Sequence, residues 1–195
     1  FGRTGNMWGS ETFNIKPDII TTAKALSSAY LPISAVILSD KVYNPIESQA
    51  NELGIFGHGY TYSAHPVCAA VALKTQQIMI ERDIISHVKK VSKVFGERIK
   101  QIFNNNWFVS HSRSVGLIGA IEFGYDKNKK FDIKKKIATQ SAKVIQNNGV
   151  ILRSLPGDVI GFCPPLIISE MQVNEMFDKI DDSMAAIHQI AENCK

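Results

Sequence analysis

The sequence DIITTAKALSSAYLPISAVILSD, residues 18–40, carries one charged side chain, Lys24, between its two terminal aspartates. On either side of Lys24, PDIITTA and ISAVIL are short runs that contain β-branched residues and are bounded by Pro, Ser and Asp. Such runs are typical of buried strands in parallel sheets. This stretch therefore predicts two strands of an α/β fold, with Lys24 directly after the first.

Lys24 has no carboxylate within several residues, although 21% of the chain is charged. An ammonium group after an apolar strand is expected to be partly desolvated, which favours the neutral amine, and a neutral amine attacks a carbonyl. Lys24 is therefore a candidate for a Schiff base with a substrate or with pyridoxal phosphate. The alternative is a lysine at the mouth of a strand whose side chain simply reaches water.

The composition indicates a folded protein, because 45% of the 195 residues are hydrophobic. The net charge of +4 depends on KNKKFDIKKK, residues 127–136, where six lysines and one aspartate give +5 and leave −1 for the remaining chain. This tract has one aromatic residue, Phe131, and lacks the stacking surface of a nucleic-acid binder. We expect a solvated loop and helix start, with no nucleic-acid partner.

The sequence has no apolar run long enough to cross a membrane and no signal-peptide pattern at its beginning. Its three cysteines, Cys68, Cys163 and Cys194, show no CxxC spacing, which argues against a disulfide framework or a zinc site. We therefore expect a soluble, cytoplasmic protein with reduced thiols and no membrane partner.

The segment GHGYTYSAHP, residues 57–66, places several hydroxyl groups before a helix that is expected to begin at Pro66. The free N–H groups of a helix N-terminus favour an anion such as phosphate. The alternative is an ordinary loop whose hydroxyl caps the helix. The spacing of His58, His65 and Cys68 matches no common metal site, so no metal is expected.

The second half of the sequence predicts helices that alternate with short strands, as in a compact α+β domain. Strands are expected around GLIGAIEF, GVILR and DVIGF, and a helix from about Ile133 to Asn147. The last helix is expected to begin at a capping box of Ser169 and Gln172. An apolar stripe predicts a long helix at the start of this half, at Ile84, Val88, Val91, Phe95, Ile99 and Ile102. A second stripe supports the last helix, at Val173, Met176, Ile180, Met184 and Ile187.

Three blocks of the sequence together resemble the class III aminotransferases, especially the omega-amino acid:pyruvate group, which use pyridoxal 5'-phosphate. The blocks are FGRTGNMWGSETFNIKPDIITTAKALSSAYLPISAV, GHGYTYSAHPVCAAVAL and GVILRSLPGDVIGFCPPLIIS. The resemblance implies a type I fold of the transferases that depend on this cofactor. Residues 1–90 would form part of the large doubly wound α/β domain, and residues 91–195 the small C-terminal α+β domain.

The resemblance also implies a role for three residues. Lys24 matches the lysine that holds the cofactor as a Schiff base and then moves a proton. Thr61 matches the threonine that reaches the cofactor phosphate, normally across the interface of a homodimer. Arg153 matches the arginine that pairs with a substrate carboxylate, and its alternative is a surface arginine balanced by Asp158. The implied reaction moves an amino group from an omega-amino acid or amine to a keto acid such as pyruvate.

The sequence departs from the family at its beginning, FGRTG. The family's aspartate for the pyridine nitrogen, its phosphate-binding Gly-Ser turn and its ring-stacking aromatic residue all precede this motif. We therefore expect a C-terminal part of an aminotransferase, cut from a longer protein or encoded by a truncated gene, and inactive alone. The alternative is a non-catalytic remnant or assembly subunit that needs the N-terminal segment. An aminomutase, racemase or decarboxylase is a lesser alternative.

Overall fold

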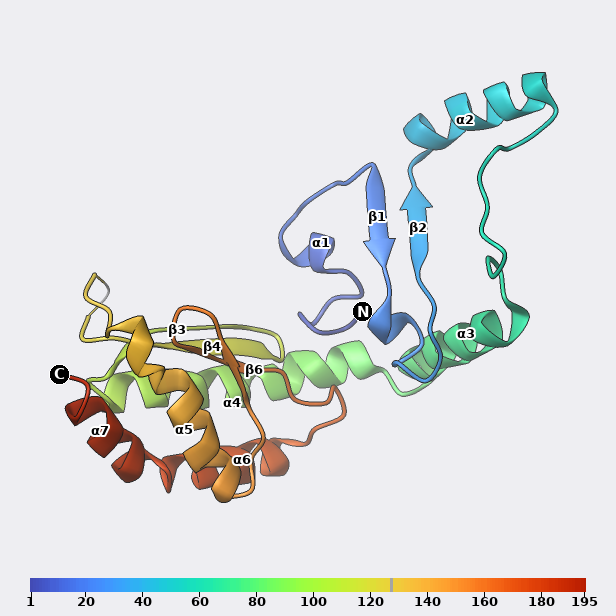
Figure 1. The fold of residues 1–195 in the computed structure, drawn as a ribbon. Coiled ribbons are helices and arrows are strands. Elements are labelled where there is room, and N and C mark those ends of the chain that lie inside the picture. Colours follow the sequence, from blue (N-terminus) through green and yellow to red (C-terminus); the bar gives the residue numbers. More distant parts are fainter. Residues whose placement is uncertain (127) are drawn as a thin grey trace. The chain divides into compact units, whose positions relative to one another are not determined.

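The computed structural model describes residues 1–126 and 128–195, so Lys127 of the basic tract lies outside the described residues. The chain divides into two compact units. The first unit contains Phe1 and Trp8–Ile84, and the second contains Gly2–Met7 and Ile85–Lys195. Figure 1 shows the elements of both units.

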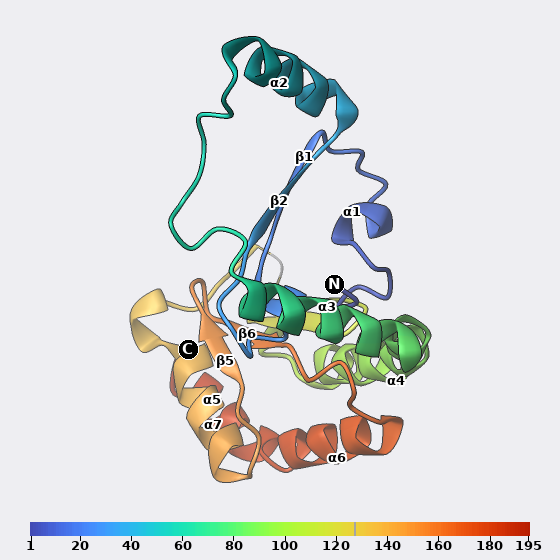
Figure 2. The same cartoon turned by 90° about the vertical axis from the view of Figure 1, so that its right-hand side faces the viewer.

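The first unit has two strands and several helical segments. Its elements are α1 (Gly9–Thr12), β1 (Ile19–Thr22), the 3-10 turn η1 (Lys24–Leu26), β2 (Ala35–Leu38), α2 (Asp40–Leu53) and α3 (Pro66–Glu81). Helix α3 begins at Pro66, as the sequence predicts, because proline lacks only an N–H that would be unpaired there. Residues 54–65 connect α2 to α3 without a helix or strand (Figure 2).

Strands β1 and β2 do not form the parallel arrangement that their composition suggests. They pair antiparallel, with Ile19 opposite Leu38 and Thr22 opposite Ala35. The connection turns the chain back on itself because it contains three left-handed residues, Lys24, Ser28 and Ala29, with φ of 51°, 52° and 61°. A reversal of this kind joins neighbouring antiparallel strands, whereas parallel strands need a crossover.

The predicted burial of these strands is also wrong for this chain. Ile19 is 54% exposed and Val36 is 64% exposed. The described residues form only a two-stranded sheet here, so both outer edges and much of the apolar surface are uncovered.

The second unit combines a four-stranded antiparallel sheet with helices, which agrees with the predicted α+β pattern. The sheet order is β3-β4-β6-β5. Its elements are α4 (Ile84–Asn105), β3 (Val109–Val115), β4 (Ile118–Phe123), the 3-10 turn η2 (Ile133–Lys135), α5 (Ile137–Asn147), β5 (Arg153–Leu155), β6 (Val159–Phe162), α6 (Glu170–Asp181) and α7 (Met184–Glu192).

Two helices differ from their predicted extents. Helix α5 begins at Ile137 and not at Ile133, because Lys136 has a left-handed φ of 50° and separates α5 from η2. The predicted last helix is two helices, since α6 ends at Asp181 and α7 begins at Met184. The Ser183 hydroxyl donates to the Lys179 carbonyl and competes with a continuous helical ladder. The capping box of Ser169 is present as predicted.

The core of the second unit forms where α4 and α6 meet the sheet. The predicted α4 stripe is confirmed, since each of its six residues is at most 6% exposed. The Phe95 ring contacts Phe162 of β6 and Phe177 of α6, with centroids 6.5 and 5.9 Å apart. Gly119 of β4 lets α4 approach closely, because a Cβ there would lie 2.2 Å from Ile99 Cδ1.

The described lysines of the basic tract are exposed, as expected for a solvated segment. Phe131 is only 5% exposed and so is not available to stack on a nucleic-acid base. In the part of the chain that the structure describes, no helix is both long and apolar enough to span a membrane.

Candidate functional site

Lys24 is the first residue of η1 and lies in a constrained turn of the first unit. Its carbonyl accepts hydrogen bonds from the N–H groups of Ser27 and Ala29, at 3.2 and 3.1 Å. Its left-handed φ is unfavourable for a residue with a side chain, and such conformations persist where the surroundings enforce them. The backbone at Lys24 is therefore fixed by more than local preference.

The Lys24 side chain is exposed, so the predicted desolvation is not found in this chain. Lys24 follows a strand that belongs to only a two-stranded sheet among the described residues, so little of this sheet is covered. Its Nζ forms no hydrogen bond or ion pair with any of those residues.

Thr61 lies in an exposed turn before α3. The Ser63 N–H donates to the Tyr60 carbonyl at 2.9 Å, and the Ser63 hydroxyl accepts from the Tyr60 N–H at 3.1 Å. His65 occupies the N-cap position of α3 and provides no side-chain cap. The alternative in which a hydroxyl caps α3 is therefore not supported, and the first N–H groups of the helix stay available to an anion.

Lys24 and Thr61 belong to the same unit. Among residues 1–126 and 128–195, no hydrogen bond or ion pair joins them. Arg153 belongs to the second unit.

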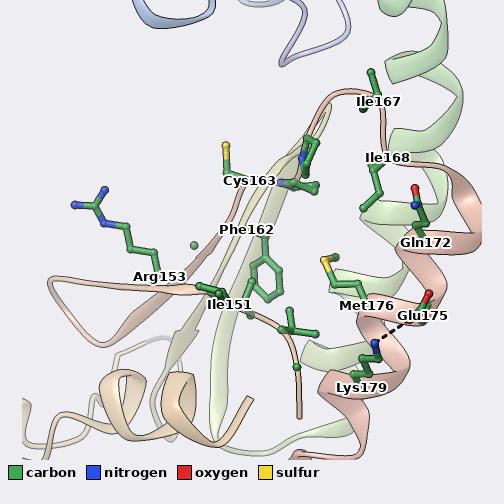
Figure 3. Close-up of a pocket in the computed structure, with 16 residues that line it drawn as sticks. Ile151, Arg153, Phe162, Cys163, Ile167, Ile168, Gln172, Glu175, Met176 and Lys179 are labelled. Carbon is green, nitrogen blue, oxygen red and sulfur yellow. Dashed lines mark hydrogen bonds and ion pairs between the residues drawn. The ribbon is translucent and has the colours of Figure 1, made fainter. Parts of the chain in front are cut away.

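Arg153 begins β5 and pairs with Gly161 of β6. Its side chain is exposed and extends away from α6 (Figure 3). Asp158 does not balance it, because the Asp158 carboxylate accepts from the N–H of Ala138 at 3.2 Å. No described carboxylate forms an ion pair with Arg153, so its guanidinium is free to receive a carboxylate from elsewhere.

A hollow of about 720 Å³ lies beside β5 in the second unit. Its walls are residues 149–153, residues 161–165, residues 167–168 and one side of α6, and they include Phe162, Cys163 and Met176 (Figure 3). Glu175 and Lys179 form an ion pair of 2.8 Å across one turn of α6. Of the two cations in this wall, Lys179 is paired with Glu175, whereas Arg153 forms no ion pair with a described carboxylate.

Two polar side chains make long-range hydrogen bonds near the candidate residues and are not evident from the sequence patterns. Gln76 of α3 donates to the Leu26 carbonyl at 2.9 Å and to the Ala25 carbonyl at 3.4 Å. Arg3 donates to the carbonyls of Leu117 and Pro164. Gln76 lies in the polar run KTQQ of α3, so the sequence does not distinguish it from its neighbours, and the acceptor of Arg3 at Pro164 is 161 residues away.

Residues 1–184 match the family described as aminotransferase class-III, which is nearly the whole chain. The chain belongs to the class III aminotransferase family. These enzymes use pyridoxal 5'-phosphate, as the resemblance of the three sequence blocks implies.

The class III aminotransferase chain is similar to only part of each curated relative. An aminotransferase of Sinorhizobium fredii, named as uncharacterized, is 40% identical over 190 residues, which are 96% of this chain and 41% of that protein. Gamma aminobutyrate transaminase 1 of Solanum lycopersicum, named as mitochondrial, is 42% identical over 178 residues, which are 90% of this chain and 34% of that protein. The chain therefore spans 34–41% of the length of these relatives.

Solved transaminase structures share the fold. A transaminase from a study of directed evolution by ancestral reconstruction gives a TM-score of 0.92 at 38% identity, over 97% of this chain and 42% of that one. The aminotransferase of Vibrio fluvialis, in a form bound to PMP, gives 0.90 at 33% identity, over 96% of this chain and 41% of that one. The type I fold implied by the sequence is thereby confirmed.

Proposed function

We propose that this chain carries the cofactor lysine and the substrate arginine of an aminotransferase that depends on pyridoxal 5'-phosphate. The observation that carries this proposal is Lys24, whose amine has no ion-pair partner among the described residues and whose backbone is held in a left-handed conformation. In the whole protein, the reaction would move an amino group from an omega-amino acid or amine to a keto acid such as pyruvate.

The first unit offers groups that fit two parts of this cofactor, its aldehyde carbon and its phosphate. The Nζ of Lys24 is exposed and has no ion-pair partner among the described residues, so it is accessible to an aldehyde carbon, with which a lysine amine forms a Schiff base. The uncapped N-terminus of α3, with the Thr61 hydroxyl in the preceding turn, suits a phosphate group. We infer that Thr61 would donate to a phosphate oxygen, across the interface of a homodimer.

Each proposed residue has a defined task. Lys24 would hold the cofactor through Nζ and, once displaced by the amino donor, would use the same nitrogen to carry a proton. Arg153 would bind the carboxylate of the acid substrate through two parallel N–H groups. When bound, pyridoxal phosphate supplies the electron sink, while the protein supplies position and charge.

The division into two units is compatible with the proposed domains. The first unit would be the portion of the large cofactor-binding domain within residues 1–90, and the second would include the small domain within residues 91–195. A cytoplasmic location is part of the proposal and rests on the three free cysteines, although the tomato relative is named as mitochondrial.

A second candidate is a non-catalytic assembly subunit that requires a complementary polypeptide. The exposed apolar side chains of the first unit favour it, since Val36 of β2 and Leu73 of α3 are each more than 60% exposed. Uncovered apolar surface and open strand edges are typical of a polypeptide that binds a partner.

The test uses the purified chain and pyridoxal phosphate. The wild-type chain should develop the visible band of a Schiff base, and borohydride should fix the cofactor to Lys24 in peptide mapping. Lys24→Ala should lose the band, whereas Lys74→Ala, at an exposed lysine of α3, should keep it. A folded wild-type chain without label at Lys24 would contradict cofactor binding.

A second assay separates the catalytic proposal from the assembly subunit. The chain is mixed with the N-terminal portion of an aligned relative, and amine-to-pyruvate transfer is measured. Transfer that disappears with Lys24→Ala supports the enzyme, and a well-folded complex without transfer supports the assembly subunit.

A further inference from the structure

The turn that contains Lys24 concentrates unfavourable backbone conformations. Lys24, Ser28 and Ala29 are left-handed although none is glycine, and they lie within six consecutive residues. Such residues keep this conformation only where other interactions hold them. The turn must therefore be stabilised by contacts that can be identified.

Some of these contacts lie within the turn itself. Besides the two bonds to the Lys24 carbonyl, the hydroxyl of Ser27 donates to the Leu31 carbonyl at 2.7 Å, and Ser27 is only 1% exposed. These bonds define the shape of the turn. They do not fix the turn relative to the rest of the first unit.

Gln76 supplies a contact from outside the turn. Its amide nitrogen reaches from α3 to the carbonyls of Ala25 and Leu26, the two residues that follow Lys24. Both partners are carbonyls, so the NH₂ group must face them and the amide cannot be reversed. Gln76 thereby connects the reactive turn to a helix that is 50 residues away in the sequence.

The amide of Gln76 makes these bonds at a cost. Its Oε1 is buried and has no hydrogen-bond partner among the described residues. A buried unpaired oxygen is unfavourable, and a leucine of similar volume would avoid it. Donation to the turn is the compensating interaction that this side chain makes.

We propose that Gln76 is a positioning residue for Lys24. The inference rests on the proposed function, in which Lys24 bonds to the cofactor. By holding the carbonyls of Ala25 and Leu26, Gln76 keeps the left-handed backbone of Lys24 in one conformation and so fixes the direction in which Nζ leaves the turn. Gln76 acts through the backbone and does not touch the reacting atoms.

The test compares neighbouring glutamines of α3 in the full chain. Gln76→Leu removes the donor at similar volume, and Gln77→Leu is the matched control because Gln77 is exposed. Hydrogen exchange at the amides of Ser27 and Ala29 reports on the turn without any cofactor. It should be faster in Gln76→Leu by about tenfold and unchanged in Gln77→Leu.

Two further measurements use added pyridoxal phosphate and report on Nζ. Borohydride trapping at Lys24 should be slower in Gln76→Leu by about tenfold, because a misplaced amine meets the aldehyde in the reactive geometry less often. The pH midpoint of the visible Schiff-base band should also shift relative to the wild type. A residue that only joins α3 to the turn would alter the exchange rates and leave both measurements unchanged.

A conservative variant keeps the test valid if Gln76→Leu does not fold. Gln76→Glu retains the side-chain length and has a donor only when protonated. Its trapping rate relative to the wild type should therefore fall as the pH rises. A ratio that stays constant with pH would contradict donation by this side chain.

The outcomes separate this inference from the proposed function. A wild-type chain that takes no label at Lys24 contradicts the function, and the positioning role with it, while the exchange data still show whether Gln76 holds the turn. A wild type that is labelled, with both Gln76 variants matching it in trapping and midpoint, overturns the positioning role and leaves the function standing.

Discussion

The carboxylate of Asp158 accepts a hydrogen bond from the N–H of Ala138, the second residue of α5, and among the described residues Asp158 forms no ion pair with Arg153. Asp158 therefore acts as a helix cap supplied by a distant segment, since Lys136 at the N-cap position provides no side-chain cap. Asp158 ends the Pro-Gly-Asp turn between β5 and β6 and has a left-handed φ of 56°. This turn therefore supplies the cap of α5, and Arg153 at the start of β5 is exposed.

Asp158→Ala should destabilise the second unit. It removes the cap of α5 and places alanine in a left-handed conformation, so the free energy of unfolding should fall by about 1–2 kcal/mol in urea titration. Asp158→Asn should cost less, because asparagine caps helices and tolerates this conformation. If Asp158 acted through Arg153, Arg153→Leu would produce the same loss, and we expect that variant to keep wild-type stability.

Arg153→Leu should weaken the use of acid substrates in the complete enzyme. Loss of charge-assisted hydrogen bonds worth about 1.5–3 kcal/mol predicts a 10- to 100-fold lower kcat/KM for pyruvate. Acceptors without a carboxylate should be little affected. Arg82→Leu, at an exposed arginine after α3, is the control. Equal losses for both kinds of acceptor would argue against carboxylate recognition by Arg153.

Gly119→Ala should destabilise the core of the second unit. The new Cβ would meet Ile99 Cδ1 at 2.2 Å, and overpacking of this kind costs about 1–3 kcal/mol. Ile99→Val removes that same methyl group, so the double variant should be more stable than additivity of the two single changes predicts. Thermal unfolding of the four proteins measures the coupling. Strict additivity would contradict a direct clash.

The second unit should lose part of its stability in acid through Glu122. The hydrogen bond from Arg113 lowers the pKa of Glu122 below its usual value, against desolvation, which raises it. A lowered folded pKa means that this stabilisation is present above the unfolded pKa and is lost as the pH falls through the folded pKa. Both side chains are partly exposed, so Glu122→Gln should remove only about 0.5–1 kcal/mol at pH 7. The difference from the wild type should shrink towards pH 3, and a constant difference would contradict this account.

The sequence predicts much of the second unit because local signals decide its elements. The α4 stripe and the Ser169 capping box have helical spacing, and both are present in the structure. The break between α6 and α7 is not predicted because the apolar period continues across it. At this break the Ser183 hydroxyl donates to the Lys179 carbonyl.

The first unit was harder to predict because its strand pairing depends on the turn between the strands. The β-branched runs predict strands at nearly the correct residues, but their direction follows from left-handed backbone at Lys24, Ser28 and Ala29, which residue type does not indicate. For the candidate site, the sequence identified Lys24, Thr61 and Arg153 as proposals. The hydrogen bonds of Gln76 and Asp158 depend on tertiary distances and could be found only in the structure.

The assignment of Gly2–Met7 to the second unit has a consequence for biosynthesis. Arg3 leaves the ribosome 161 residues before its acceptor at Pro164. At about 5–20 residues per second, the segment waits roughly 10–30 s for that partner. The first unit, encoded between them, is complete before the second can close. The Gly2–Met7 segment is therefore synthesised before most of the first unit, yet it reaches its contact with Pro164 only after the first unit is complete.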